Sequence, residues 1–528
     1  MKKTLIFMIV FAMLCTVLLG LPSVSIAEEL PKDGGTLVVA TKLEPSWFTI
    51  NYVPDGAIQY INRNIYSKLV AYDHSTKEMY GDLAENWEVL EEGKVYNFKL
   101  REGVTWHDGE PFTAADVEWT INSILEFGEG ANAYLKLNNV ETCEVIDDYT
   151  IKITLKEASG AFLNNLADYY GFDILPKHIY EDTDVLENPA NQNPIGTGPF
   201  KFAEHVNGSH IRLEANHDYY GDGPYLDEVI FQFTPSETTA ITAIEAGDAD
   251  WMTASPPFAE IERLRAIDGV EVDLDPSGIM QWIVFNVDGS RPYINDLNVR
   301  KAILLAIDRE EIAEKLYQGM VKPAESWYST LIEWADNKDI RMPERDVEKA
   351  NQLLDEAGYE RGEDGYRFEL TYLAFQTSIF GTTDIPTFVK QALDEIGIKV
   401  NIGTYEWAIR TEMLSKRDWD ICANGGDRTP DPDNFSRNLR SELKVNLGQY
   451  ANKELDAAFD HGNTAIEQED RAEHYYEFQR IVSEDVPYVN IIEYVLPRVR
   501  RDNLSGFFWQ EDSGICADHM LNTVHFID

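Results

Sequence analysis

Segments with the pattern of β-strands alternate with segments typical of α-helices along the second half of this chain. Residues 368–373 are rich in β-forming side chains and predict a strand. Residues 386–396 predict a helix that ends at Gly397. Further strands are predicted at residues 399–402 and 419–422. This alternation favours an α/β unit built on a mixed sheet.

The same signals continue elsewhere in the chain. Residues 35–41 predict a strand, and residues 298–316 and 347–357 predict helices. Thr113 and Asp116 have the spacing of a capping box, in which each side chain binds a free backbone N–H at the start of a helix. An apolar stripe follows them, so a helix is predicted to begin here.

The N-terminus has the features of a secretory signal peptide. Lys2 and Lys3 precede an apolar run over residues 4–21, and Ser25 and Ala27 form a small-x-small cleavage signal. We expect residues 1–27 to be removed and the mature protein to be soluble in the periplasm or at the cell surface. The alternative is an uncleaved anchor, because the run approaches the length that spans a bilayer. Leu14 before Cys15 argues against a lipid anchor.

Length and charge restrict the organisation and the partners. A chain of 528 residues is too long for one hydrophobic core and predicts several lobes. Its 92 acidic and 45 basic residues give a net charge of −47, which repels nucleic acid. We expect a monomer that does not bind nucleic acid. Cys143, Cys422 and Cys516 allow at most one internal disulfide, and their spacing does not choose the pair.

The sequence contains no recognisable catalytic or metal-binding motif. His205, His210 and His217 are close together but lack zinc-ligand spacing. Asp427, Asp431 and Asp433 resemble a calcium loop, but prolines interrupt them and the required glycine is missing. We therefore predict a protein that is not an enzyme and needs no metal or cofactor. A secreted hydrolase is the remote alternative.

Several blocks of sequence together resemble one family. They are residues 81–89 (GDLAENWEV), 96–109 (YNFKLREGVTWHDG), 113–117 (TAADV), 196–200 (GTGPF), 217–220 (HDYY), 285–286 (FN), 299–302 (VRKA) and 306–309 (AIDR). In this order they resemble the peptide- and nickel-binding class of solute-binding proteins that serve ATP-driven (ABC) importers. The resemblance extends from near Gly35 almost to the end of the chain.

The resemblance implies a fold and a mode of action. The fold is α/β and like that of type II periplasmic binding proteins, with two ligand-binding lobes and an extra lobe, hinged by crossing strands. Lobe I is expected at residues 28–73, 188–281 and 500–528, lobe II at 74–187 and lobe III at 282–499. Ligand is expected between lobes I and III, and the closed receptor is expected to dock on ABC permease subunits with their ATPases.

The resemblance also suggests ligand-binding residues. Asp427 falls where dipeptide and oligopeptide receptors bind the α-ammonium of the peptide, although an aspartate here could instead serve only the Gly-Gly turn. Asn424, Gly425 and Gly426 before it would offer backbone groups to an extended ligand. Ser46 and Trp47 are expected on the opposite wall. Trp407 is expected to line a side-chain pocket; both tryptophans have a core-packing alternative.

The identity of the ligand stays open between two classes. Thr377 stands near the position of an arginine that binds the ligand carboxylate in some dipeptide receptors, which puts a fixed dipeptide length in doubt. Arg428, Arg437 or Arg440 are possible substitutes for that arginine. An oligosaccharide is the alternative ligand. Gln376 and Asn424 would then bind sugar hydroxyls through their amides, and Trp47 and Trp407 would stack on sugar rings. No histidine or arginine cluster suggests the nickel or haem ligands of related branches.

Overall fold

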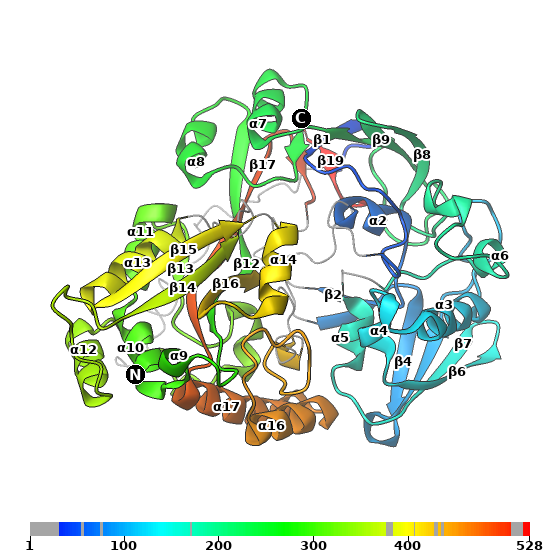
Figure 1. Ribbon diagram of the computed structural model, residues 1–528. Coiled ribbons are helices and arrows are strands. Elements are labelled where there is room, and N and C mark those ends of the chain that lie inside the picture. Colours follow the sequence, from blue (N-terminus) through cyan, green and yellow to red (C-terminus); the bar gives the residue numbers. More distant parts are fainter. Residues whose placement is uncertain are drawn as a thin grey trace, which may run out of the picture.

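A computed structural model describes residues 31–53, 58–73, 78–168, 172–375, 384–405, 407–426, 431–433, 438–507 and 521–527. Figure 1 shows three groups of elements around two long central strands, β12 and β17. β1, β8, β9, α7 and α8 lie at the top of this view. β4, β6, β7, α3 and α4 lie at the right, and β14, β15, α9–α13, α16 and α17 lie at the left and bottom.

A mixed sheet of 11 strands runs through the molecule. Its order is β15-β14-β16-β12-β17-β11-β1-β10-β9-β8, and β13 pairs with β17. The strands are β1 (Thr36–Thr41), β8 (Phe200–Val206), β9 (His210–Ala215), β10 (Glu228–Phe233), β11 (Trp251–Met252), β12 (Val270–Phe285), β13 (Lys322–Pro323), β14 (Phe368–Phe375), β15 (Ile398–Tyr405), β16 (Ile421–Gly426) and β17 (Tyr488–Arg501). β1 is parallel to β10 and β11, and β14 is parallel to β15 and β16. The mixed sheet that the sequence predicts is therefore present.

β12 and β17 connect the two halves of this sheet. Near one end of the β12–β17 pair, Trp251 and Met252 of β11 pair with β17. Near the other end, all of β16 pairs with the last residues of β12. The register of β12 against β17 shifts between Pro276 and Ile279. Such an irregularity weakens a ladder locally and bends the strand. The predicted crossing strands are thus present, with an irregularity between the two halves. The lobe boundaries themselves stay a prediction.

Residues 84–168 form a separate antiparallel unit. Its sheet, in the order β4-β5-β7-β6, consists of β4 (Ala84–Leu90), β5 (Val95–Leu100), β6 (Val140–Asp147) and β7 (Thr150–Leu155). Helices α3 (Ala114–Phe127), α4 (Tyr134–Leu137) and α5 (Phe162–Ala167) belong to it, and α6 (Lys177–Tyr180) follows. The capping box at Thr113 and Asp116 is confirmed: the Thr113 N–H donates to Asp116 Oδ2 over 2.9 Å.

Two of the family-like motifs contact each other and join the antiparallel unit to its neighbour. His107 Nε2 lies 3.0 Å from the Gly198 carbonyl oxygen, and the Gly196 N–H donates to His107 Nδ1 over 3.2 Å. The His107 imidazole is therefore neutral, with the proton on Nε2. A Cβ on Gly196 would lie 1.8 Å from the Ile65 carbonyl oxygen, so only glycine permits this close approach.

Further buried contacts hold the antiparallel unit against the segment after β1. The Ala133 N–H donates to the Asn51 carbonyl oxygen over 2.9 Å, and the Tyr52 and Ser123 hydroxyls lie 2.7 Å apart. Between α2 (Gln59–Ile65) and the chain just before β4, Arg63 pairs with Asp82 over 3.0 Å, both nearly fully buried. Separating Arg63 from Asp82 would leave buried charges unpaired. We therefore infer that the antiparallel unit and the segment from β1 to α2 move as one body.

Helices pack against the remainder of the large sheet. They are α7 (Glu237–Ala246), α8 (Phe258–Arg265), α9 (Pro292–Asn295), α10 (Leu297–Ala306), α11 (Arg309–Tyr317), α12 (Val347–Glu356), α13 (Ile385–Glu395), α14 (Trp407–Lys416), α16 (Lys453–Thr464) and α17 (Gln468–Asp485). The prediction of one helix over residues 298–316 is wrong. The chain breaks at Ile307, and the Asp308 side chain accepts from the Glu311 N–H over 2.8 Å and starts a second helix.

Short elements complete the described chain. They are β2 (Val70–Asp73), β3 (Glu78–Gly81), β18 (Leu504–Ser505), β19 (His525–Phe526) and the 3₁₀ helices η1 (Glu91–Gly93), η2 (Gly128–Gly130), η3 (Pro189–Asn191) and η4 (Thr330–Ala335). None of the described helices is both long and apolar enough to cross a bilayer. Cys143 and Cys422 are buried and form no disulfide; Cys516 lies outside the described residues.

Buried apolar side chains form two clusters. One contains the antiparallel unit together with β1, β10 and α2. The other contains β12, β14, β16, β17 and the helices at the left and bottom of Figure 1, and it also includes α7, α8 and side chains of β1 and β11. We treat the antiparallel unit with α2 as one body and β14, β16, α16 and α17 as the other, because each of these groups contributes to one cluster only.

Candidate ligand-binding site

Among the described residues, the end of β16 has no strand partner on one side, and it lies near the centre of the molecule (Figure 1). Gly425 and Gly426 pair with Gln281 and Met280 of β12 on one side. On the other side, within the described residues, β14 pairs with β16 only at Ile421 and Cys422. Backbone groups from Asn424 onward are thus placed to accept an added strand on that side.

Glycine suits this strand end. Gly426 has φ 138°, a conformation that L side chains rarely adopt, so another residue here would be strained. Among the described residues, an added Cβ would come within 4.0 Å of the Trp282 ring alone. The backbone at Gly426 is therefore open to close approach by another group.

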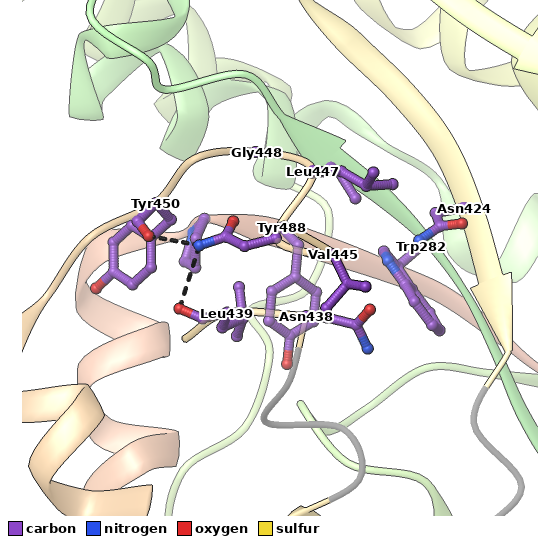
Figure 2. A pocket seen from close by; sticks show the side chains of 12 residues that line it. Trp282, Asn424, Asn438, Leu439, Val445, Leu447, Gly448, Tyr450 and Tyr488 are labelled. Atoms are coloured by element: carbon purple, nitrogen blue, oxygen red, sulfur yellow. Dashed lines mark hydrogen bonds between the residues drawn. The ribbon is translucent and has the colours of Figure 1, made fainter. Parts of the chain in front are cut away.

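A pocket lies beside Asn424 (Figure 2). It contains about 340 Å³ of space, part of it open to solvent. The described residues that line it are uncharged: Trp282, Val284, Asn424, Asn438, Leu439, Val445, Asn446, Leu447, Gly448, Tyr450, Pro487 and Tyr488. Trp282 and Asn424 are register partners on β12 and β16 and lie together along one wall. Apolar surface with a few amides is typical of sites for uncharged groups.

Asn446 holds the loop that forms the outer wall of this pocket. It is fully buried, and its amide donates to the Tyr450 carbonyl oxygen over 2.7 Å and the Arg440 carbonyl oxygen over 3.1 Å. The Val287 N–H donates to the Gly448 carbonyl oxygen over 2.8 Å, which fixes the loop to the chain after β12. Hydrogen bonds within the protein therefore hold the outer wall of the pocket in place.

A second pocket lies on the opposite face of the β12–β16 pair. Gln281, Ile283, Tyr372, Pro386 and Ala423 are among its lining residues. Gln281 and Tyr372 are almost fully buried, and no hydrogen bond to the Gln281 amide or the Tyr372 hydroxyl is formed by the described residues. Burial raises the pKa of the Tyr372 hydroxyl, so this group stays protonated and able to donate.

The predicted ligand-binding residues are only partly described. Asn424, Gly425 and Gly426 form the end of β16, as stated above. Asp427, Gln376 and Thr377 lie outside the described residues, so their roles stay predictions. Trp407 is the first residue of α14, and only its backbone is described.

The predicted opposite wall, Ser46 and Trp47, lies on the loop after β1. Ser46 is exposed and its carbonyl oxygen accepts from Gln192 Nε2 over 2.9 Å, while Trp47 is half-buried. Glu44 on the same loop accepts from the Gly208 N–H over 3.1 Å and contacts His205. The loop is thus fixed, but a contact with ligand stays a prediction.

Sequence reasoning missed the role of Asp431. Its carboxylate is fully buried and binds Arg471 through both oxygens, at 2.8 and 2.9 Å. Asp433 accepts from Arg440, which also pairs with Asp460. Arg440, considered above as a partner for a ligand carboxylate, is therefore already engaged with two carboxylates. No group of three possible metal ligands occurs among the described residues.

The sequence model of the bacterial extracellular solute-binding proteins, family 5, matches residues 78–446. The chain belongs to this family. The solute-binding proteins similar to it include the oligopeptide-binding protein AppA of Bacillus subtilis, which is 31% identical over 497 residues, covering 90% of this chain and 89% of that protein. Heme-binding protein A of Haemophilus influenzae is 28% identical over 529 residues, covering 93% of this chain and 94% of that protein.

Solved structures of family members show the same architecture. Bacillus subtilis AppA in complex with a nonapeptide matches with a TM-score of 0.78 at 28% identity, over 94% of this chain and 100% of that one. The periplasmic binding protein DppA of Helicobacter pylori in complex with the peptide STSA matches with a TM-score of 0.79 at 27% identity, over 94% and 99%. The predicted family and the predicted periplasmic-binding-protein-like fold are confirmed.

Proposed function

We propose that this solute-binding protein captures peptides outside the cytoplasmic membrane and delivers them to an ABC permease. The observation that carries the proposal is the open edge at Asn424–Gly426 in a chain that belongs to this family. An extended peptide satisfies its backbone N–H and C=O groups by pairing with such an edge. Two of the similar proteins named above carry bound peptides.

Uncharged side chains suit the pocket beside Asn424. Because the described residues that line it carry no charge, a charged side chain would lose hydration there without gaining an opposite charge from them. The same pocket, with its amides and aromatic rings, also favours the second candidate, a neutral oligosaccharide. The ammonium group expected at Asp427 distinguishes the two classes, since only a peptide supplies it.

The ligand itself provides the direct test. The protein is purified without refolding, unfolded gently, and the released small molecules are identified by mass spectrometry. Peptides in near-stoichiometric amount support the proposal, and sugars would favour the oligosaccharide receptor. Incubation with a tryptic digest of casein tests turnover in parallel. A receptor retains a subset of these peptides unchanged, whereas new cleavage products that co-purify with the protein would contradict a purely binding function.

Export is part of the proposal. Signal-peptide cleavage after Ala27 would release the receptor from the membrane, in keeping with a family described as extracellular. N-terminal sequencing of the native protein checks this directly. A mature chain that begins at Glu28 is expected, and a chain that retains residues 4–21 would identify an anchored receptor instead.

A further inference from the structure

The antiparallel unit contacts the α16–α17 hairpin through the turn that precedes α5. Ser159 Oγ donates to Asn463 Oδ1 over 2.9 Å, and the Gly160 N–H donates to the Asn463 carbonyl oxygen over 2.6 Å. One turn further on, Asn164 Nδ2 donates to Asp431 Oδ2 over 2.6 Å. Three hydrogen bonds thus join segments that are far apart in the sequence.

The two surfaces also fit closely. A Cβ on Gly160 would lie 2.1 Å from the Ala465 carbonyl oxygen, which is backbone and does not swing away. The Gly160 backbone does not have positive φ, so alanine would be tolerated there by the local chain itself. Any larger residue at this position must therefore push the antiparallel unit away from the hairpin.

This contact lies between the two bodies defined by their cores. The antiparallel unit belongs to one hydrophobic cluster, and α16, α17 and β16 belong to the other. Contacts such as those of His107 with Gly196 and Gly198 hold the antiparallel unit to its own side. A hinge motion about β12 and β17 therefore forms or breaks the contact.

Asp431 connects the contact with the ligand segment. It follows residues 427–430 directly, and these include Asp427, the residue expected to bind the peptide ammonium. Arg471 fixes both of its oxygens and is itself held by the Gly462 carbonyl oxygen over 2.8 Å. Asn164 adds a donor from the other body to the same carboxylate.

We propose that Asn164 and Gly160 form a latch that retains the ligand. Asn164 is a positioning residue: it donates to Asp431, which Arg471 already fixes, only when the two bodies are closed. A contact made in the closed state alone shifts the equilibrium toward that state and slows ligand release. This inference rests on the proposed function for the nature of the ligand, but the latch itself depends only on closure.

Three variants distinguish an effect on ligand release from a general loss of folding stability. Asn164→Ala removes the donor, and Gly160→Ala keeps the surfaces apart. Asn165→Ala is the matched control, because Asn165 is half-buried on the same helix and its side chain forms no hydrogen bond within the described residues. Protein loaded with casein tryptic peptides is diluted, and the peptides that remain bound are measured over time by mass spectrometry.

Release from Asn164→Ala is expected to be about tenfold faster than from the natural protein, since hydrogen bonds to charged groups have roughly this effect. Release from Asn165→Ala is expected to stay within about twofold, as for a surface substitution without partners. The melting temperature of the stripped protein is expected to be the same for all variants, because the open state lacks the contact. Unchanged release from both Asn164→Ala and Gly160→Ala would overturn the proposal.

A cross-link tests the latch without knowledge of the ligand. Ser159→Cys and Asn463→Cys are combined in a protein that also carries Cys516→Ser. The native Cys143 and Cys422 are kept, because burial raises the pKa of the Cys143 thiol and raises that of Cys422 to about 11, so both react little. Disulfide formation is expected to be faster in protein as purified than after stripping. Equal rates would show a permanent contact and refute the latch. If the natural protein retains no peptide but its cross-linking still depends on ligand, only the proposal that the ligand is a peptide is refuted.

Discussion

Arg471 and Asp431 form an ion pair in which the two side chains are 5% and 0% exposed. Burial opposes the charge on Arg471, but the Asp431 carboxylate more than offsets this and raises the pKa of the guanidinium. The pair stabilises the body around α17 only while both charges are present, because each one alone would be buried without a partner.

Arg471→Met is therefore expected to destabilise that body by about 3–5 kcal/mol, the usual cost of leaving one member of a buried pair. Arg480→Met on the same helix is the control. Its guanidinium is 40% exposed and pairs with Glu477 and Glu484, so a loss below about 1 kcal/mol is expected. Urea unfolding followed by tryptophan fluorescence measures both. Equal losses would contradict the importance of the buried pair.

The contact of His107 with Gly196 and Gly198 predicts a pH dependence of stability. Burial lowers the pKa of His107 to about 4, against an ordinary value of 6.5. Below pH 6.5 the unfolded chain gains a proton that the folded protein does not bind. Stability is therefore expected to fall between about pH 6.5 and pH 4, by roughly 3 kcal/mol from this residue, and to be independent of it at higher pH.

The contribution of His107 is isolated by comparing variants over the same pH range. His107→Gln is expected to be less stable at pH 7, but its stability should decline less steeply toward pH 4. His217→Gln, on an exposed loop, is the control and should follow the natural protein. Parallel curves for His107→Gln and the natural protein would show that His107 is protonated in the folded state as easily as in the unfolded one.

Gly196 is expected to tolerate no side chain. Because its Cβ would lie 1.8 Å from the Ile65 carbonyl oxygen, Gly196→Ala must displace α2 or the antiparallel unit. We expect a loss of about 2 kcal/mol or more, in the range of overpacked sites. Gly130→Ala is the control, because its Cβ meets only the Phe127 ring, which is 39% exposed and can move. Thermal melting of the two variants decides the point.

Local signals in the sequence were reliable where the interaction is local. The capping box at Thr113 and Asp116 predicted the start of α3, since both partners lie within one turn. The break at Ile307 was missed because Asp308 is acceptable inside a helix and caps one only once the chain turns. The strands and helices predicted above are thus present, apart from this interruption and shifts of a few residues at their ends.

The candidate site was less predictable, because its decisive contacts are between distant segments. Asp431 lies 40 positions from Arg471 and 267 from Asn164, and no pattern in the sequence connects them. Because Asp431 is close to other aspartates in the sequence, the only role considered for it was in a calcium loop, which was rejected. In the structure it is buried and pairs with an arginine. The resemblance predicts which strand end faces the ligand, and this stays a prediction, whereas the packing between the two bodies had to come from the structure.

The last prediction distinguishes a peptide from a sugar through Asp427, which lies outside the described residues. When the two bodies close on a peptide, its ammonium loses water, and a fixed carboxylate must replace that hydration. Asp427→Ala is expected to cost about 2–5 kcal/mol of binding, which is a loss of affinity from tens-fold to thousands-fold. Acetylating the amine of a bound peptide should weaken binding to the natural protein similarly.

Calorimetry with free and acetylated forms of one retained peptide completes the test. Because acetylation and Asp427→Ala remove the two partners of a single interaction, the acetylated peptide should bind the variant hardly less well than the free one does. A neutral sugar would lose only one or two ordinary hydrogen bonds in Asp427→Ala, about 1 kcal/mol each. If acetylation leaves binding to the natural protein unchanged, Asp427 does not bind an ammonium group, and the uncharged pocket beside Asn424 becomes the main determinant of the ligand.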